Sequence, residues 1–281
     1  MKRIIWATDF SEAGDAALSW AELLAKPTKA RVIGIHVVPV VPVAYGGLGF
    51  DYSVLSDVLI HQKETAMEAL KDQLQSLERH GQESEALVEE GGAVSRIVGL
   101  ADEKKADLVV MGTRSLSPLK RFFVGSTAVG VVRASKAPVL TVRRRPGANG
   151  LKRILATTDL SAASWKAYHF ARRLADRHGA ELHLLHVVEL YDYQIPKEEW
   201  NTLAVQIEKK LRRRVAGTTT ETRLAFAADA PDGISRYAGR HSMDLIVLGS
   251  HVVGGATRWL LGSVCERMVR DSAAPVLVVR G

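Results

Sequence analysis

Three observations predict that this chain has an α/β fold, present twice in tandem. First, the chain repeats itself: ATDFS, which ends at Ser11, returns as TTDLS, which ends at Ser161. Second, short apolar runs rich in Val, Ile and Leu recur, as is typical of buried strands. Third, helical patterns separate these runs, and a strand–helix–strand order implies parallel strands joined by right-handed crossovers. We therefore expect two doubly wound domains, each with a mainly parallel sheet wrapped by helices.

Five apolar runs in the first half predict the strands of its sheet. In the first half they are the runs KRIIWAT, RVIGIHVV, EALV, DLVVMG and APVLTV. Each spans about four to eight residues, a length typical of strands that are buried on both faces.

The first helix of each half follows from apolar residues at the spacing i, i+3, i+4 and i+7. Its apolar stripe consists of Ala13, Ala16, Ala17, Trp20, Ala21 and Leu24 in the first half, and of Ala163, Ala167, Phe170, Ala171 and Leu174 in the second. Lys166 is the one polar residue in the second stripe, and Ser11 and Ser161 are placed to cap these helices. Residues 54–79 and 197–215 predict longer amphipathic helices.

The two copies differ in length before their glycine-rich segments. Asp159 follows Asp9 by 150 positions, whereas Gly249 follows Gly112 by 137, so the first copy has 13 additional residues. We expect this insertion at 39–52, because its Pro, Gly and Tyr residues suit a surface loop. The Pro- and Gly-containing stretch near residue 146 predicts domains at 1–145 and 152–281, joined by a linker at 146–151.

Composition and charge exclude several classes of protein. The 281 residues are 47% hydrophobic and 25% charged, and they contain no apolar run of the roughly 20 residues that span a bilayer. The N-terminus lacks the pattern of a signal peptide, so we expect a cytoplasmic protein without a membrane partner. Cys265 is the single cysteine, which excludes an intrachain disulfide. The net charge of +7 is dispersed, which favours solvated faces over a nucleic-acid groove.

Candidate binding residues lie where the strands of each half end, because ligands of open α/β sheets bind at the carboxyl ends of the strands. Asp9 and Asp159 follow the first strand, where a carboxylate can accept hydrogen bonds from ribose hydroxyls; the alternative is that they only shape the turn. Val37 and Val187 end the second strand, where backbone groups can read an adenine edge. The neighbouring histidines are interpreted as satisfied core groups.

The glycine-rich segment after the fourth strand is the most specific signal. Glycine lets a backbone approach a ligand closely, and the free N–H groups of a helix start suit phosphate oxygens. The candidates are Gly112, Arg114, Ser115, Gly125, Ser126 and Thr127 in the first half, and Gly249, His251, Gly262, Ser263 and Val264 in the second.

With these residues in view, the chain resembles a tandem universal stress protein. Nucleotide-binding members of that family carry G-x2-G-x9-G-[S/T] after the fourth strand, and Gly112, Gly125 and Ser126 match it with the required spacing. The resemblance implies a Rossmann-like, five-stranded parallel sheet in each domain and ATP, or ADP or AMP, bound at the strand ends. It also implies pairing of domains within the chain or in a homodimer, action through a protein partner not specified by the sequence, and no established catalytic reaction.

One position departs from the motif in both halves, where Ser115 and Val252 replace its second glycine. If this position needs a left-handed backbone, valine suits it worst, so the first site ranks above the second.

The sequence is consistent with three functions, which we rank. The leading hypothesis is a nucleotide-binding stress regulator; the runner-up is a scaffold of the same fold that binds no nucleotide and acts through dimerisation. An enzyme is third, because no P-loop GxxxxGK[ST] and no HxGH stretch occur, which leaves weak ATP hydrolysis at most. No clustered metal ligands occur either, so Mg²⁺ is expected only through the phosphates.

Overall fold

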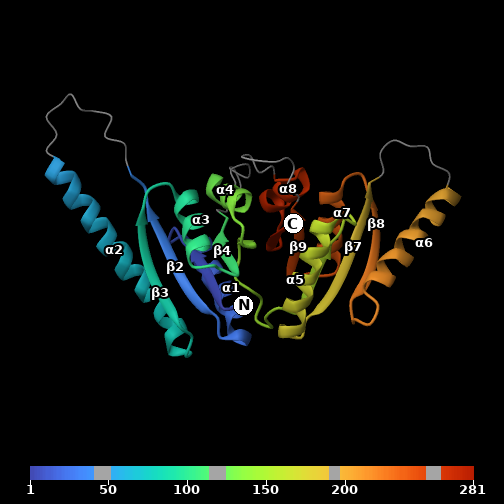
Figure 1. Ribbon diagram of the computed structural model, residues 1–281, viewed down its shortest axis with the longest axis horizontal. Helices are drawn as coiled ribbons and strands as arrows, with labels where there is room; N and C mark the ends of the chain where they lie inside the picture. The colour runs from blue at the N-terminus through green and yellow to red at the C-terminus, as the bar shows by residue number, and fades with distance from the viewer. Residues whose placement is uncertain (41–51, 114–124, 190–196, 251–260) are drawn as a thin grey trace, which may run out of the picture. The chain divides into compact units, whose positions relative to one another are not determined.

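The structure of the chain is a computed structural model that describes residues 1–40, 52–113, 125–189, 197–250 and 261–281. The chain divides into two compact units, which we call unit 1 (Met1–Arg145) and unit 2 (Pro146–Gly281). In Figure 1 the colours of unit 1 run from blue to green and those of unit 2 from yellow to red.

Strands and helices alternate along unit 1. Its elements are β1 (Arg3–Ala7), α1 (Glu12–Ala25), the short 3-10 helix η1 (Lys26–Thr28), β2 (Arg31–Val38), α2 (Tyr52–Arg79), β3 (Ser84–Glu90), α3 (Ala93–Glu103), β4 (Leu108–Gly112), α4 (Ser126–Ala134) and β5 (Val139–Val142). All five runs that we expected as strands are strands.

Unit 2 repeats this order without the 3-10 helix. Its elements are β6 (Arg153–Thr157), α5 (Ala162–His178), β7 (Glu181–Glu189), α6 (Lys197–Arg214), β8 (Glu221–Ala227), α7 (Ala230–Arg240), β9 (Leu245–Ser250), α8 (Ser263–Asp271) and β10 (Val276–Arg280). Among the helices in the described parts of both units, none is long and apolar enough to cross a membrane.

The sheet of each unit is parallel and doubly wound, which confirms the predicted fold class. The strand order is β3-β2-β1-β4-β5 in unit 1 and β8-β7-β6-β9-β10 in unit 2. In unit 1, Ile5 pairs with Ile33 on β2 and with Val109 on β4. Because right-handed crossovers change faces when the direction of winding reverses, α1 and α2 cover one face and α3 and α4 the other. The winding direction of the sheet reverses between β1 and β4 in unit 1, and between β6 and β9 in unit 2.

The predicted stripe of the first helix is confirmed in unit 1 and shifted in unit 2. All six residues of the α1 stripe are buried, and the Ser11 hydroxyl caps α1 by accepting from Gly14 N at 3.3 Å. In α5, however, Phe170 is only half-buried, whereas Trp165 and Tyr168 are buried beside the stripe. The Tyr168 hydroxyl bonds to the Thr220 hydroxyl at 3.0 Å, so this end of the unit packs around an aromatic pair.

Helix α2 of unit 1 is longer than its counterpart in unit 2. It has 28 residues, and α6 has 18. The helices that we predicted at 54–79 and 197–215 are confirmed as α2 and α6. Most of the insertion that we predicted at 39–52 lies outside the described residues, so its placement in a surface loop stays a prediction.

A buried polar pair distinguishes the core of unit 2. His183 on β7 is 6% exposed, and its Nδ1 bonds to the Tyr237 hydroxyl on α7 at 2.8 Å. The positions that correspond in unit 1 are Ile33 and Leu100, which are both buried. Burial lowers the pKa of His183 from its usual value, more than the nearby carboxylate of Glu221 raises it. The charged and titratable groups around the imidazole are Glu181 on β7, Glu221 and Arg223 on β8, and Tyr237 and His241 on α7.

We expect the stability of unit 2 to fall as the pH drops below about 6.5, the pKa of histidine in an unfolded chain. The folded unit holds His183 neutral, whereas the unfolded chain takes up the proton, so the contribution is complete above that pH and is lost below it. The double substitution His183→Ile and Tyr237→Leu copies the unit 1 core and should flatten this dependence. Thermal unfolding of the full chain between pH 7.5 and 5.5 measures it. An equally steep pH dependence in the double variant would contradict the assignment.

Candidate functional site

A pocket of about 460 Å³ lies at the switch point of unit 1, at the carboxyl ends of β1, β2 and β4 and the starts of α3 and α4. We call it the unit 1 pocket. It is lined by Ala7, Thr8, Asp9, Ile35, His36, Val37, Pro39, Gly91, Ala93, Ile97, Met111, Gly112, Gly125, Ser126, Thr127 and Ala128.

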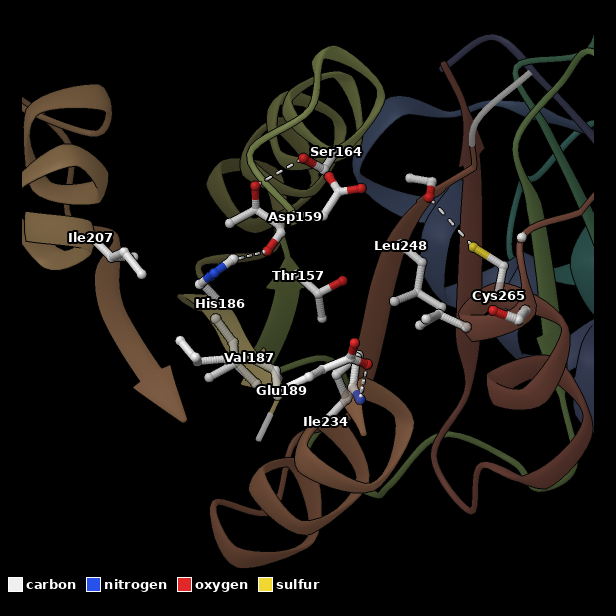
Figure 2. A pocket seen from close by; sticks show the side chains of 18 of the residues that line it. Thr157, Asp159, Ser164, His186, Val187, Glu189, Ile207, Ile234, Leu248 and Cys265 are labelled. Carbon is white, nitrogen blue, oxygen red and sulfur yellow. Dashed lines mark hydrogen bonds between the residues drawn. The ribbon is translucent and has the colours of Figure 1, made fainter. Parts of the chain in front are cut away.

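The equivalent place in unit 2 has a pocket of about 550 Å³, which we call the unit 2 pocket. It is lined by residues 157–159, Ser164, residues 185–189, Leu203, Ile207, Ala230, Ile234, Leu248, Gly249 and residues 262–265. Figure 2 shows side chains that reach this pocket from separate elements, among them Ile207 from α6, Ile234 from α7 and Cys265 from α8.

The structure brings the predicted site residues together in both units. Every candidate within the described residues lines a pocket: Asp9, Val37, Gly112, Gly125, Ser126 and Thr127 in unit 1, and Asp159, Val187, Gly249, Gly262, Ser263 and Val264 in unit 2. The candidates Arg114, Ser115 and His251 lie outside the described residues, as does Val252. What these pocket residues bind is not shown by their position, and their binding roles stay predictions.

The aspartate of unit 1 shapes the turn between β1 and α1 as well as lining the pocket. Its Oδ1 accepts from the backbone N–H of Ser11 at 3.2 Å and from the Ser11 hydroxyl. Between them Phe10 has φ of 59°, a left-handed conformation that is uncommon outside glycine. The Thr8 hydroxyl stabilises this conformation by accepting from Phe10 N at 3.0 Å.

Unit 2 repeats this turn. Asp159 Oδ1 accepts from Ser161 N at 3.0 Å, and Leu160 has φ of 70°. The two interpretations of the aspartate, turn former and pocket residue, therefore hold together, because one carboxylate both closes the turn and borders the pocket.

The end of β2 presents backbone groups to the pocket. Ile35 O accepts from Thr8 N at 3.0 Å on the β1 side, whereas Val38 O accepts from Gly91 N at 3.0 Å on the β3 side. Successive residues of a parallel strand bond to opposite neighbours, so the peptide groups of Val37 point the same way as those of Ile35. Because β1 has ended at this level, they face the pocket rather than a strand.

The same geometry recurs in unit 2, where Thr158 N donates to Leu185 O at 2.9 Å. Val187 is two residues further along β7, so its peptide groups also face the pocket. A ligand with a donor and an acceptor on one edge can bond to this side of the strand end, where the first strand of the unit no longer runs beside it.

The two strand-end histidines are held by the backbone, but they are half-buried and line the pockets, whereas the sequence predicted core groups. Nδ1 of His36 bonds to Thr8 O at 3.0 Å, and Nδ1 of His186 bonds to Thr158 O at 2.7 Å. A carbonyl oxygen only accepts, so the proton of each imidazole lies on Nδ1. These hydrogen bonds hold each imidazole against the strand-to-helix turn.

The two glycines of each motif have different physical roles. A Cβ on Gly112 would lie 2.5 Å from the carbonyl carbon of Ala13, and one on Gly249 would lie 2.6 Å from Ala163 O. These glycines let the first helix pack onto the sheet, a role that the motif did not indicate, and the close approach of Gly112 to a ligand stays a prediction. A Cβ on Gly125, by contrast, would meet no atom of the described residues within 4 Å.

Open space at Gly125 lies beside a helix start that has no side-chain cap. Gly125 and Gly262 are the N-cap residues of α4 and α8, and neither helix start has a hydrogen bond from a capping side chain. Ser126 and Ser263 are exposed in the first turn. A helix start of this kind favours anions through its N–H groups and its dipole.

Several pocket residues were missed by sequence reasoning. Gly91, Ala93 and Ile97 at the start of α3 line the unit 1 pocket, and Glu189 and Ala230 line the unit 2 pocket. Most of these residues follow the third strand of a unit, β3 or β8, from which no motif was taken, and Glu189 lies two residues beyond the predicted Val187. The Gly-Gly pair at 91–92 was the available signal, because a glycine pair between a strand and a helix marks a tight turn at the same sheet edge.

The single cysteine is a structural residue of the unit 2 pocket. Cys265 is 4% exposed, and its thiol donates to Gly249 O at 3.4 Å. Burial, with a smaller contribution from Asp159, raises the pKa of this thiol to about 12. It is therefore protonated and unreactive at neutral pH.

Over the described residues, no three His, Cys, Asp or Glu side chains are grouped so as to hold a metal ion.

Two tandem doubly wound units, each with a pocket at its switch point, place the chain in the Rossmann-like class of α/β proteins. The universal stress protein family model matches residues 1–143 and 150–280. The chain belongs to the universal stress protein family, as a member with two domains in tandem.

Known proteins of this family are similar to the chain over its whole length or over one half. A universal stress protein of Mycolicibacterium smegmatis is 28% identical over 99% of this chain and 96% of its own length. One from Methanocaldococcus jannaschii is 35% identical over 51% of this chain and 82% of its own length. The crystal structure of a universal stress protein from Archaeoglobus fulgidus has the same fold, with a TM-score of 0.74 at 24% identity, and covers 99% of this chain and 98% of that one.

Proposed function

We propose that this protein is a stress-response regulator that binds an adenine nucleotide, ATP or its di- or monophosphate, in one or both units. The observation that supports it most directly is the convergence in each pocket of three separate segments. These segments supply an aspartate, a strand-end valine and an uncapped glycine–serine helix start.

Each part of the nucleotide has a matching group in the unit 1 pocket. The peptide groups of Val37 would bond to the edge of the base, and the carboxylate of Asp9 would accept from a ribose hydroxyl. The first turn of α4, with the hydroxyls of Ser126 and Thr127, would hold phosphate oxygens. Any Mg²⁺ would arrive with the phosphates.

The size and shape of the pockets suit such a ligand. Volumes of about 460 and 550 Å³ lie within the roughly 300–1,000 Å³ that small-molecule sites occupy. The open space at Gly125 leaves room for an oxygen to approach the helix start. Apolar side chains at Ile35, Ile97 and Met111 supply the slot that a base needs.

We propose binding without substantial turnover, with slow ATP hydrolysis at most. The His36 imidazole holds its proton on Nδ1 against a backbone carbonyl, and the Asp9 carboxylate closes a turn. The hydrogen bonds of both groups thus serve the strand-to-helix turn, which supports a binding role over a catalytic one. Pairing of the two domains and formation of a homodimer belong to the same proposal, as does action through a protein partner.

We expect purified protein to release an adenine nucleotide on heating, and to bind ATP in calorimetry with Mg²⁺ present. Chromatography of the heat-released material identifies the ligand, and the stoichiometry distinguishes one filled unit from two. A sample that carries no nucleotide and shows no heat of binding would instead support the alternative, a scaffold of the same fold that acts through dimerisation.

A further inference from the structure

The two pockets differ at the end formed by the start of the third helix. In unit 1, α3 begins at Gly92 without a side-chain cap, and Gly91 and Ala93 line the pocket. In unit 2, the Asp229 carboxylate caps α7 by accepting from Asp232 N at 2.8 Å. The start of α3 thus has no capping side chain, whereas that of α7 is capped by Asp229, whose carboxylate also accepts from Arg267 Nη1 at 2.7 Å.

A second carboxylate reaches α7 from inside the unit 2 pocket. Glu189, at the end of β7, accepts from Ala230 N at 2.8 Å, and both residues line the pocket. Figure 2 shows the Glu189 side chain extending from the strand beside Val187 to the helix that bears Ile234. The residue that corresponds to Glu189 in unit 1 is Pro39, which is neutral.

The charge of the lining differs accordingly. Among the described residues, the acidic ones lining the unit 2 pocket are Asp159 and Glu189, whereas Asp9 alone lines the unit 1 pocket. At the opposite end, Val264 stands where Thr127 offers a hydroxyl in unit 1, so α8 has one donor fewer for an anion. Both differences make the unit 2 pocket less favourable for a highly charged ligand.

We infer that the two pockets select adenine ligands of different charge: the unit 1 pocket takes the polyphosphates ATP and ADP, and the unit 2 pocket takes the nucleoside or its monophosphate. Glu189 is the residue that sets this difference, because its carboxylate offsets the positive end of α7. This inference rests on the proposed function. It extends that function by giving each unit a ligand class of its own.

Calorimetry with adenosine, AMP, ADP and ATP tests the inference on the full chain. Gly125→Val and Gly262→Val, at the starts of α4 and α8, weaken phosphate binding in one unit each, so the ATP-binding step that a variant removes is assigned to that unit. We expect unit 1 to bind ATP more tightly than adenosine, and unit 2 to show the reverse order.

Glu189→Gln then tests the residue itself. Glutamine keeps an oxygen that can accept from Ala230 N but removes the charge, so the fold is retained. In the Gly125→Val background, we expect the ratio of adenosine to ATP affinity to shift towards ATP by roughly tenfold. Glu181→Gln is the matched control, because it neutralises a carboxylate at the opposite end of the same strand.

The outcomes separate this inference from the proposed function. Binding with the same rank order in both units, or a ratio that Glu189→Gln leaves unchanged, would overturn the inference and leave nucleotide binding in place. No binding of any of the four ligands to either unit would overturn the proposed function itself.

Discussion

Replacement of Gly125 by valine is expected to weaken binding of ATP to unit 1 by roughly 100-fold, a loss typical of a side chain forced into an occupied space. The Cβ of residue 125 would point into open space at the start of α4, where the proposed site receives phosphate oxygens. With φ of −53°, the residue has a backbone conformation that any amino acid adopts. The fold should therefore lose only about 1 kcal/mol, the usual effect of a poorer N-cap residue.

The measurement is calorimetric titration of the full chain in the Gly262→Val background, so that only unit 1 contributes. Gly125→Ala provides a graded control, because a single methyl group should weaken binding less than valine does. Thermal unfolding checks that both variants remain folded. If the affinity for ATP stayed the same in a folded Gly125→Val protein, the helix start of α4 would not be the phosphate site.

Replacement of Gly112 by alanine is expected to destabilise unit 1 by about 3 kcal/mol, at the upper end of the usual effect of overpacking. The new Cβ would lie 2.5 Å from the carbonyl carbon and 2.6 Å from the carbonyl oxygen of Ala13. Both atoms belong to the backbone of α1, so no side chain can turn away, and the helix must move off the sheet. Binding would be lost through this movement rather than through contact with the ligand.

Urea unfolding of the full chain measures this change, with Gly125→Ala as the matched control from the same motif. The control adds the same methyl group where nothing lies within 4 Å, and its midpoint should stay close to that of the natural protein. Equal midpoints for the two variants would show that α1 adjusts freely, and the close packing at Gly112 would then carry no stability.

Local features of the fold were predictable because short stretches of sequence determine them. Ser11 was expected to cap α1, and its hydroxyl accepts from Gly14 N, since a cap depends on residues three positions apart. The α1 stripe also follows from helical spacing alone. The burial of Tyr168 in α5 did not follow, because its hydroxyl bonds to Thr220, which is distant in sequence.

The candidate site could be predicted in part, and for a similar reason. Gly125 and Ser126 could be picked out from the sequence, because a glycine followed by a small hydroxyl residue at a helix start is a pattern that suits phosphate oxygens. The role of Gly112 could not be read from its motif, because the atoms that exclude a side chain belong to Ala13, in another element.

The sequence by itself determined the tandem repeat, the family, the alternation of strands and helices, and the residues that end the strands. Its apolar periodicity and its repeated motifs are properties of neighbouring residues. Only the tertiary structure decided that α3 and α7 border the pockets and that Glu189 bonds to the start of α7. The physical reason is that parallel strands from distant segments end at one edge of the sheet, so residues far apart in the chain become neighbours there.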